Sequence, residues 1–219
     1  MTTATIAVKG SASDDFPADY AIAHFGYEFN APERSEALAG GNAVVARLRE
    51  SVAQAVGIRE MKVHSFRVEE TYNHVGPDHV REHSGWVAQV GGQLLIEPSA
   101  VSAAVAELIK TGARTNELTW HLDPDTQLQA HRAVRRQAVA NASEAANDFA
   151  LALGAQMGRL ITLADPGLLG TRPNAGWVAA AATARSRRSD ASWDEFIDID
   201  LEVITISANV EASYEVTLP

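Results

Sequence analysis

The sequence predicts an α+β fold in which mostly antiparallel sheets pack against one long, alanine-rich helix and two shorter helices. Apolar residues alternate with the two-residue period of strands in several segments, and recur every three or four residues in others. The helical segments do not alternate one for one with the strands, which disfavours a parallel α/β sheet. The first and second strands, and the third and fourth, follow one another as hairpins do, so we expect antiparallel pairing.

The first elements are two strands and a helix. Residues 5–9 alternate as a short strand, and the run Gly-Ser-Ala-Ser-Asp-Asp at 10–15 has the composition of a turn. Residues 19–29 place an apolar or small side chain at every second position, which predicts the second strand. A helix then follows, with Asn30 as its expected N-cap and Gly57 as its stop.

The central part of the chain continues the α+β pattern. We expect a strand over 62–72, a polar loop over 73–82 and a strand over 85–96. The adjacent glycines Gly91 and Gly92 predict a bend or bulge inside the second of these strands. A short amphipathic helix is expected over 98–112.

The longest predicted helix runs from Asp123 to about Leu153, after a strand over 116–122 and before one over 158–164. Its many alanines indicate close backbone approach to the element on which it packs. The predicted buried stripe consists of Leu128, Val134, Ala138, Ala142, Ala145, Phe149 and Leu153.

The C-terminal part begins with a long, flexible, arginine-containing loop at about 165–192, rich in small residues. Apolar residues then occupy odd positions from Ile197 to Val203 and even positions from Ile204 to Leu218. A slip of one residue exchanges the faces of a strand, so a bulge or break is expected near Val203 and Ile204. No linker divides the chain, and the sequence predicts a single domain over 1–219.

Composition excludes several classes of protein. The chain has 219 residues, 46% of them hydrophobic and 21% charged, which is typical of a globular protein. It has no cysteine, which rules out disulfides, thiolate metal sites and cysteine nucleophiles. A net charge of −10 disfavours nucleic acid as a partner. There is no membrane-spanning apolar run and no visible signal peptide, so the expected location is the cytoplasm.

The densest polar cluster consists of His74, Asp78, His79 and His83, within the predicted loop. Imidazole and carboxylate groups bind zinc or nickel, so these four residues are the candidate metal ligands. Their spacing matches no metal motif, and a solvated loop without metal is the alternative. No cofactor is predicted.

The remaining histidines offer no catalytic constellation in the sequence. His24, His64 and His121 lie in strand-like segments, where packing and a catalytic role are the competing interpretations, and none has a partner recognisable from its spacing. A Gly-rich phosphate loop and a nucleophile elbow are both missing. We therefore predict no catalytic residue and expect a protein that is not an enzyme.

The order of segments resembles the SIMPL-domain family. The likeness rests on Ile-Ala-Val-Lys-Gly at 6–10, on Ser-Gly-Trp-Val-Ala at 84–88 with Trp86 where members have tyrosine, on the alanine-rich 138–142 helix segment, and on Ile-Ser-Ala-Asn-Val at 206–210. These motifs of small and apolar residues cover nearly the whole chain. The resemblance implies the fold, a tendency to self-assemble and, as in some bacterial members, a link to oxidative-stress defence. It supplies no catalytic residues.

Many relatives carry an export signal, and this sequence shows none. The leading hypothesis is therefore a non-enzymatic structural or interaction protein of the bacterial cytoplasm that forms a homo-oligomer. A small-molecule or metal-binding module using the 74–83 loop is the first alternative. A hydrolase-like enzyme without a recognisable motif is the second.

Overall fold

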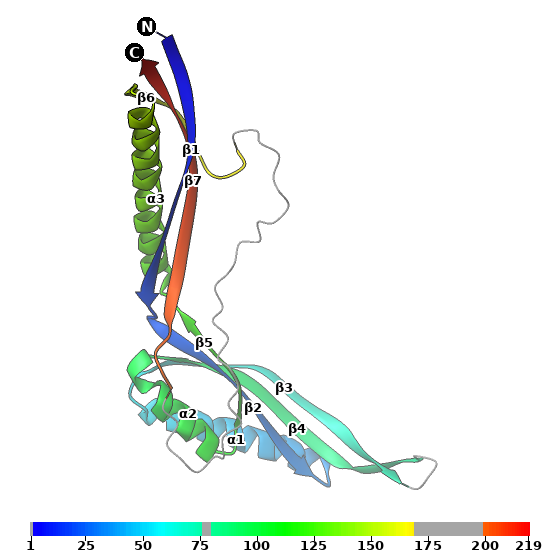
Figure 1. Ribbon diagram of the computed structural model, residues 1–219. Helices are drawn as coiled ribbons and strands as arrows, with labels where there is room; N and C mark the ends of the chain where they lie inside the picture. Colours follow the sequence, from blue (N-terminus) through cyan, green and yellow to red (C-terminus); the bar gives the residue numbers. More distant parts are fainter. Residues whose placement is uncertain (1, 76–79, 169–198) are drawn as a thin grey trace. The chain divides into compact units, whose positions relative to one another are not determined.

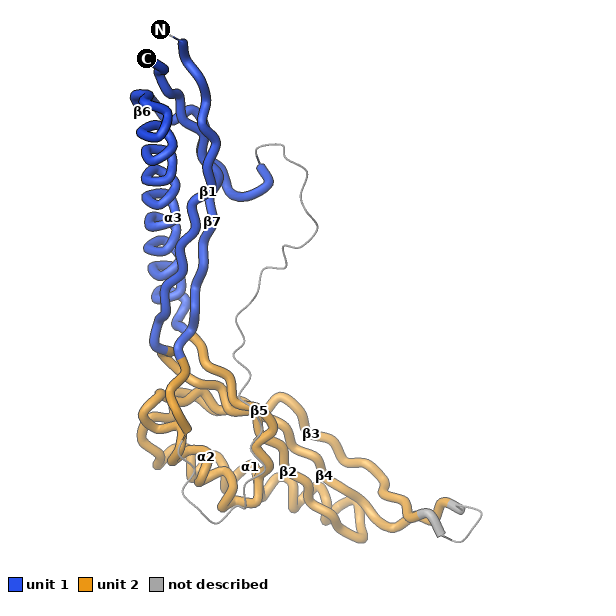
Figure 2. The backbone as a smooth tube through the Cα atoms, viewed as in Figure 1, with its two compact units in different colours: residues 1–17, 122–183, 203–219 blue, residues 18–121, 184–202 orange. Residues whose placement is uncertain are grey.

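The computed structural model describes residues 2–75, 80–168 and 199–219. These residues form three α-helices and two antiparallel sheets, which confirms the predicted α+β class (Figure 1). The chain divides into two compact units, coloured separately in Figure 2. Unit 1 consists of residues 1–17, 122–183 and 203–219, and unit 2 of residues 18–121 and 184–202. That the whole of 1–219 acts as one domain stays a prediction.

Unit 1 is a three-stranded sheet with one long helix against it. Its sheet has the order β1-β7-β6, formed by Thr2–Pro17, Val203–Leu218 and Gln156–Ala164. Strands β1 and β7 pair from Thr2 opposite Leu218 to Pro17 opposite Val203. Helix α3 (Pro124–Ala152) lies along both strands, as Figure 1 shows. Because β7 begins at Val203, the predicted break there is confirmed.

The buried face of α3 is made almost entirely of alanine. It comprises Ala130, Val134, Ala138, Ala142, Ala146 and Ala150, spaced four residues apart. The prediction that Leu128, Phe149 and Leu153 belong to this stripe is wrong, since they are 48%, 56% and 56% exposed. The helix contributes mainly small side chains to this interface, and the sheet contributes larger ones such as Val210 and Tyr214.

The contact with β1 shows how close this approach is. A Cβ atom on Gly10 would lie 2.0 Å from the Ala138 carbonyl oxygen and 2.6 Å from the Ala142 nitrogen. The predicted turn at 10–15 is therefore wrong: these residues continue β1, and Gly10 is the contact point for the helix. Because glycine has no side chain, it admits the helix backbone where any other residue would block it.

Unit 2 is a four-stranded antiparallel sheet with two helices. Its strand order is β3-β4-β2-β5. The sequence β-α-β-β-α-β with this order is the ferredoxin-like arrangement. The elements are β2 (Tyr20–Ala31), α1 (Arg34–Gln54), β3 (Ile58–Val75), β4 (Val80–Ile96), α2 (Val101–Lys110) and β5 (Arg114–His121).

The core of unit 2 lies between the helices and one face of the sheet. Phe25 and Leu94 project from the strands, and Leu48 meets them from α1, all at most 2% exposed. Burying a side chain of this size contributes roughly 1.5–3 kcal/mol. The alternation of strand residues sends the intervening side chains, among them His24, to the opposite, open face.

Several predicted boundaries in unit 2 need correction. The predicted loop over 73–82 is strand at both ends, because β3 continues to Val75 and β4 starts at Val80; residues 76–79 lie outside the described residues. Asn30 still belongs to β2, and the N-cap of α1 is Glu33. The predicted pairing of the first two strands is wrong, since β1 and β2 belong to different sheets.

The bulge expected at Gly91 and Gly92 is found on the strand opposite them. The pairing of β3 with β4 shifts between Val63 and Ser65, which face Gly92 and Gly91. The predicted long loop at 165–192 lies outside the described residues from 169 on. No helix within the described ranges has the length and apolar character needed to cross a membrane.

Candidate functional site

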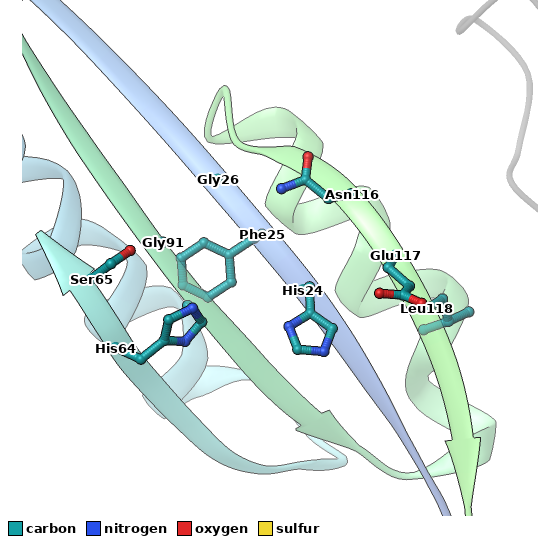
Figure 3. Close-up of a pocket in the computed structure, with 10 residues that line it drawn as sticks. His24, Phe25, Gly26, His64, Ser65, Gly91, Asn116, Glu117 and Leu118 are labelled. Atoms are coloured by element: carbon teal, nitrogen blue, oxygen red, sulfur yellow. The ribbon is translucent and has the colours of Figure 1, made fainter. Parts of the chain in front are cut away.

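A hollow of about 750 Å³ lies in unit 2, on the part of the sheet where Gly91 and Gly92 face the β3 bulge (Figure 3). All four strands of the sheet contribute to it. Its lining residues are His24, Phe25, Gly26, His64, Ser65, Gly91, Gly92, Asn116, Glu117 and Leu118.

Two glycines form the floor of the hollow. Gly26 of β2 and Gly91 of β4 lie directly opposite each other in the ladder. A Cβ atom on Gly26 would meet only the Asn116 Nδ2 atom, at 3.3 Å. One on Gly91 would meet the Ser65 Oγ at 2.4 Å and the His64 Nε2 at 3.7 Å. Neither glycine contributes a side chain, so the base of the hollow is peptide backbone that is open above Gly26 and bordered by the Ser65 hydroxyl at Gly91.

Two register shifts supply side chains at the walls. His64 is the extra residue of β3 between Val63 and Ser65. In β5 the register moves from Glu117 opposite His24 to Thr115 opposite Phe25, which makes Asn116 the extra residue. A bulge re-aims side chains that a regular strand would send elsewhere. The two bulges therefore place His64 and Asn116 beside the glycine floor.

A third histidine of the sheet, His121, interacts electrostatically with His24 of the hollow. His121 of β5 has its Nε2 atom 2.9 Å from the Thr119 Oγ1, and its ring stacks on Tyr20 with centroids 5.4 Å apart. Burial, and secondly the charge of His24, lower the pKa of His121 below its ordinary value of 6.5. His121 is therefore held in its neutral form at neutral pH.

Polar groups without partners gather at this hollow. His24, His64, Ser65, Asn116 and Glu117 make no side-chain hydrogen bond or ion pair with any other described residue. Some polar groups elsewhere in the same sheet are paired. Gln89 donates to Glu28 at 3.4 Å, Arg114 lies 3.9 Å from Glu28, and Lys62 lies 2.9 Å from Glu60. The unpaired donors and acceptors are thus available to water or to a ligand.

The predicted metal ligands do not belong to this hollow. Asp78 and His79 lie outside the described residues, and His74 is placed on β3 opposite Arg81. The His83 ring contacts Tyr72 and Trp86, each with centroids 5.9 Å apart. No group of three or more His, Cys, Asp or Glu side chains in the described part of the chain is arranged to hold a metal ion. The metal site at 74–83 stays a prediction.

His24 and His64 had no partner recognisable in the sequence, and the fold brings both to one hollow. Their separation in the chain hides this, because β4 lies between their strands. The available signal was the glycine content of strand segments: Gly26 interrupts one otherwise alternating pattern, and Gly91 and Gly92 interrupt another. Glycine inside a strand indicates a bulge or a close approach of another group.

Unit 1 carries a second notable surface at the end of α3 and on β6. Six large apolar side chains there are between 45% and 68% exposed. Strand β6 is an edge strand whose ladder partner among the described strands is β7. We call this set the apolar margin: Phe149, Leu151, Leu153, Leu160, Ile161 and Leu163.

The fold defines an α+β protein built on two antiparallel sheets, with a polar hollow on one and an apolar edge on the other. The chain belongs to the SIMPL family, described as a protein of unknown function (DUF541), whose model matches residues 6–214. The resemblance drawn from the sequence motifs is thereby confirmed. A comparison with curated proteins found no match.

Proposed function

We propose that this protein is a non-enzymatic structural protein that assembles with copies of itself through the β6 edge. The observation that carries the proposal is the apolar margin on a strand edge that pairs with no other strand among the described residues. Monomeric proteins seldom expose large contiguous apolar surface, and where they do it commonly marks an interaction site. An unpaired strand edge adds a row of backbone donors and acceptors ready to join another strand.

The two edges of the unit 1 sheet differ in how they are protected. β1 carries Asp14, Asp15 and Pro17, which discourage edge pairing. β6 contains a single charged residue, Arg159, and its Nε atom lies 3.0 Å from a Glu215 carboxylate oxygen of β7. The Arg159 side chain is 82% exposed, so β6 has one solvent-facing charge, whereas β1 has two acidic residues and a proline at its end.

Charge favours a second copy of this chain at β6. The protein has a net charge of −10, so two copies repel each other over most of their surfaces. The segment Gln156–Ala164 contains no acidic residue. Repulsion is therefore weak along this strand, where three large apolar side chains are exposed. The simplest contact is antiparallel β6 against β6 about a two-fold axis, since such a contact uses one surface twice.

The native mass of the purified chain and of two lysine variants tests this proposal. Ile161→Lys places a charge on the β6 edge, and Val56→Lys adds the same charge at a 93% exposed apolar position of unit 2. Sedimentation at micromolar concentration should show an oligomer for the wild type and for Val56→Lys, and a 23.4 kDa monomer for Ile161→Lys. A monomeric wild type, or an Ile161→Lys variant that stays assembled, would refute the proposal.

A role in stress defence, which rests on the family resemblance, and a cytoplasmic location are finer proposals. Survival of a deletion strain under peroxide, together with fractionation of cells expressing the full gene, tests both. Unchanged survival would remove the stress role. Recovery of the protein outside the cytoplasm would remove the proposed location.

A further inference from the structure

The glycines on the two faces of the unit 2 sheet have different neighbouring atoms. Between the helices and the sheet, Phe25 lies over Gly92, since a Cβ atom there would be 2.4 Å from the Phe25 Cζ atom. An aromatic ring placed over a glycine restores the packing that the missing side chain forfeits. At Gly26 and Gly91 the nearest atoms are polar ones from Asn116, Ser65 and His64. The glycine floor therefore lacks the ring that its neighbour Gly92 has.

The dimensions and the shape of the hollow suit a flat ligand. Its volume of about 750 Å³ lies in the range of small-molecule sites. The floor is the backbone of two paired strands, open above Gly26 and bordered at Gly91 by the Ser65 hydroxyl. A planar ring lying on it would contact both strands at once, whereas a puckered ring of similar size would touch fewer atoms.

The rim of the hollow favours a positively charged ligand. Glu117 is its one charged residue at neutral pH, with histidines counted as neutral, and it makes no hydrogen bond or ion pair with a described residue. In Figure 3 its carboxylate group stands beside the hollow, on the strand next to His24. An unpaired carboxylate favours a ligand that carries a positive charge, and the net charge of −10 disfavours anions.

We propose that the hollow binds a small planar aromatic amine, with its ring on the Gly26–Gly91 floor and its ammonium group at Glu117. The imidazoles of His24 and His64 flank the ring, and the amide of Asn116 is in place for a ring N–H or a polar substituent. This site is independent of the β6 edge, because every lining residue belongs to unit 2.

Calorimetric titration of the full chain with three matched probes tests the ligand class. Tryptamine has the flat ring and the cation, 2-cyclohexylethylamine keeps the cation without the flat ring, and indole-3-acetate keeps the ring with the opposite charge. We expect tryptamine to bind about tenfold or more tightly than either of the others. Equal affinity for tryptamine and 2-cyclohexylethylamine, or no binding of tryptamine at millimolar concentration, would overturn the proposal.

Three variants locate the site. Gly26→Val puts a side chain on the floor, and Glu117→Gln removes the charge; each should weaken tryptamine binding about tenfold. Glu36→Gln makes the same charge change on α1, away from the hollow, and should leave binding unchanged. An equal loss in Glu36→Gln and Glu117→Gln would overturn the assignment. Circular dichroism verifies that each variant is folded, and Glu117→Gln keeps the test decisive if Gly26→Val does not fold.

The same titration separates this inference from self-assembly. Ile161→Lys alters the β6 edge of unit 1 and leaves every lining residue of the hollow in place. It should therefore bind tryptamine as the wild type does, whatever its native mass. Loss of binding in this variant would contradict the independence of the two sites.

Discussion

Replacing Gly10 by alanine should loosen the packing of α3 on β1. The added Cβ atom would lie 2.0 Å from the Ala138 carbonyl oxygen, 2.6 Å from the Ala142 nitrogen and 2.7 Å from the Ala142 Cβ. Two of these three obstacles are backbone atoms of a helix that cannot rotate away as a flexible side chain can. The helix or the strand must therefore shift as a whole.

The expected cost follows from the nature of the obstacle. Overpacking a well-filled interior typically costs about 1–3 kcal/mol, and the upper end applies where backbone must move. For a chain of 150–250 residues, about 1 kcal/mol lowers the melting temperature by roughly 2–4 °C. We therefore expect Gly10→Ala to melt roughly 6–12 °C below the wild type.

Thermal unfolding followed by circular dichroism at 222 nm measures this effect. Gly26→Ala is the matched control, because it is also a glycine-to-alanine change within a strand and its Cβ would meet one atom, at 3.3 Å. The control should be neutral or slightly stabilising, since glycine in a strand is less favourable than alanine. A melting temperature for Gly10→Ala within about 2 °C of the wild type would refute the close packing of α3 on β1.

Two further variants test electrostatics and hydrogen bonding. The pKa of His121 is lowered in the folded state, so the unfolded chain binds this proton more readily and stability falls as the pH drops below 6.5. Between pH 7.5 and 5.5, the melting temperature of His121→Gln should therefore fall less than that of the wild type. An equal fall in both proteins would argue against the lowered pKa. The Asn141 Nδ2 atom donates to the Ser11 carbonyl oxygen of β1 at 2.8 Å, so Asn141→Ala should lower the free energy of unfolding, measured in urea, by about 1 kcal/mol. The control Asn147→Ala, at an exposed position of the same helix, should change it by less than about 0.5 kcal/mol.

The α+β class was predictable because it depends on periodicity, which is written locally in the sequence. Most strands and all three helices follow from alternation or from three-to-four spacing. The stripe of α3 was predicted in part, since Val134, Ala138 and Ala142 are buried as expected. Phe149 and Leu153 misled the prediction, because hydrophobicity alone places them inside, whereas the buried face of α3 passes through Ala146 and Ala150.

The boundary of β1 could not be predicted from local composition. Gly10 and the small polar residues after it have the character of a turn, yet β7 pairs with the strand as far as Pro17. That partner lies about two hundred positions later in the chain, and local propensity is overridden by such pairing. The order of the sheets is likewise a property of distant contacts, which is why β1 pairs with β7 rather than with β2.

The hollow could not be predicted from residue spacing either, because it also depends on contacts between distant parts of the chain. Its histidines come from β2 and β3, and the strand that separates them in the sheet is β4. Their approach depends on two glycines at paired positions and on a bulge that turns His64 toward them. Each glycine was visible in the sequence, but their registration across strands is set only by the folded sheet.

Hydrogen exchange at β6 tests self-assembly most directly, because it reports on the backbone amides of the proposed contact. Exchange of peptides covering 156–164 should be followed by mass spectrometry at nanomolar and at tens of micromolar protein concentration. If copies pair through this edge, these amides become protected as the concentration rises, while those of β5, an edge strand of the unit 2 sheet, do not change. Exchange of β6 at the same rate at both concentrations, with a monomeric native mass, would contradict assembly through this strand.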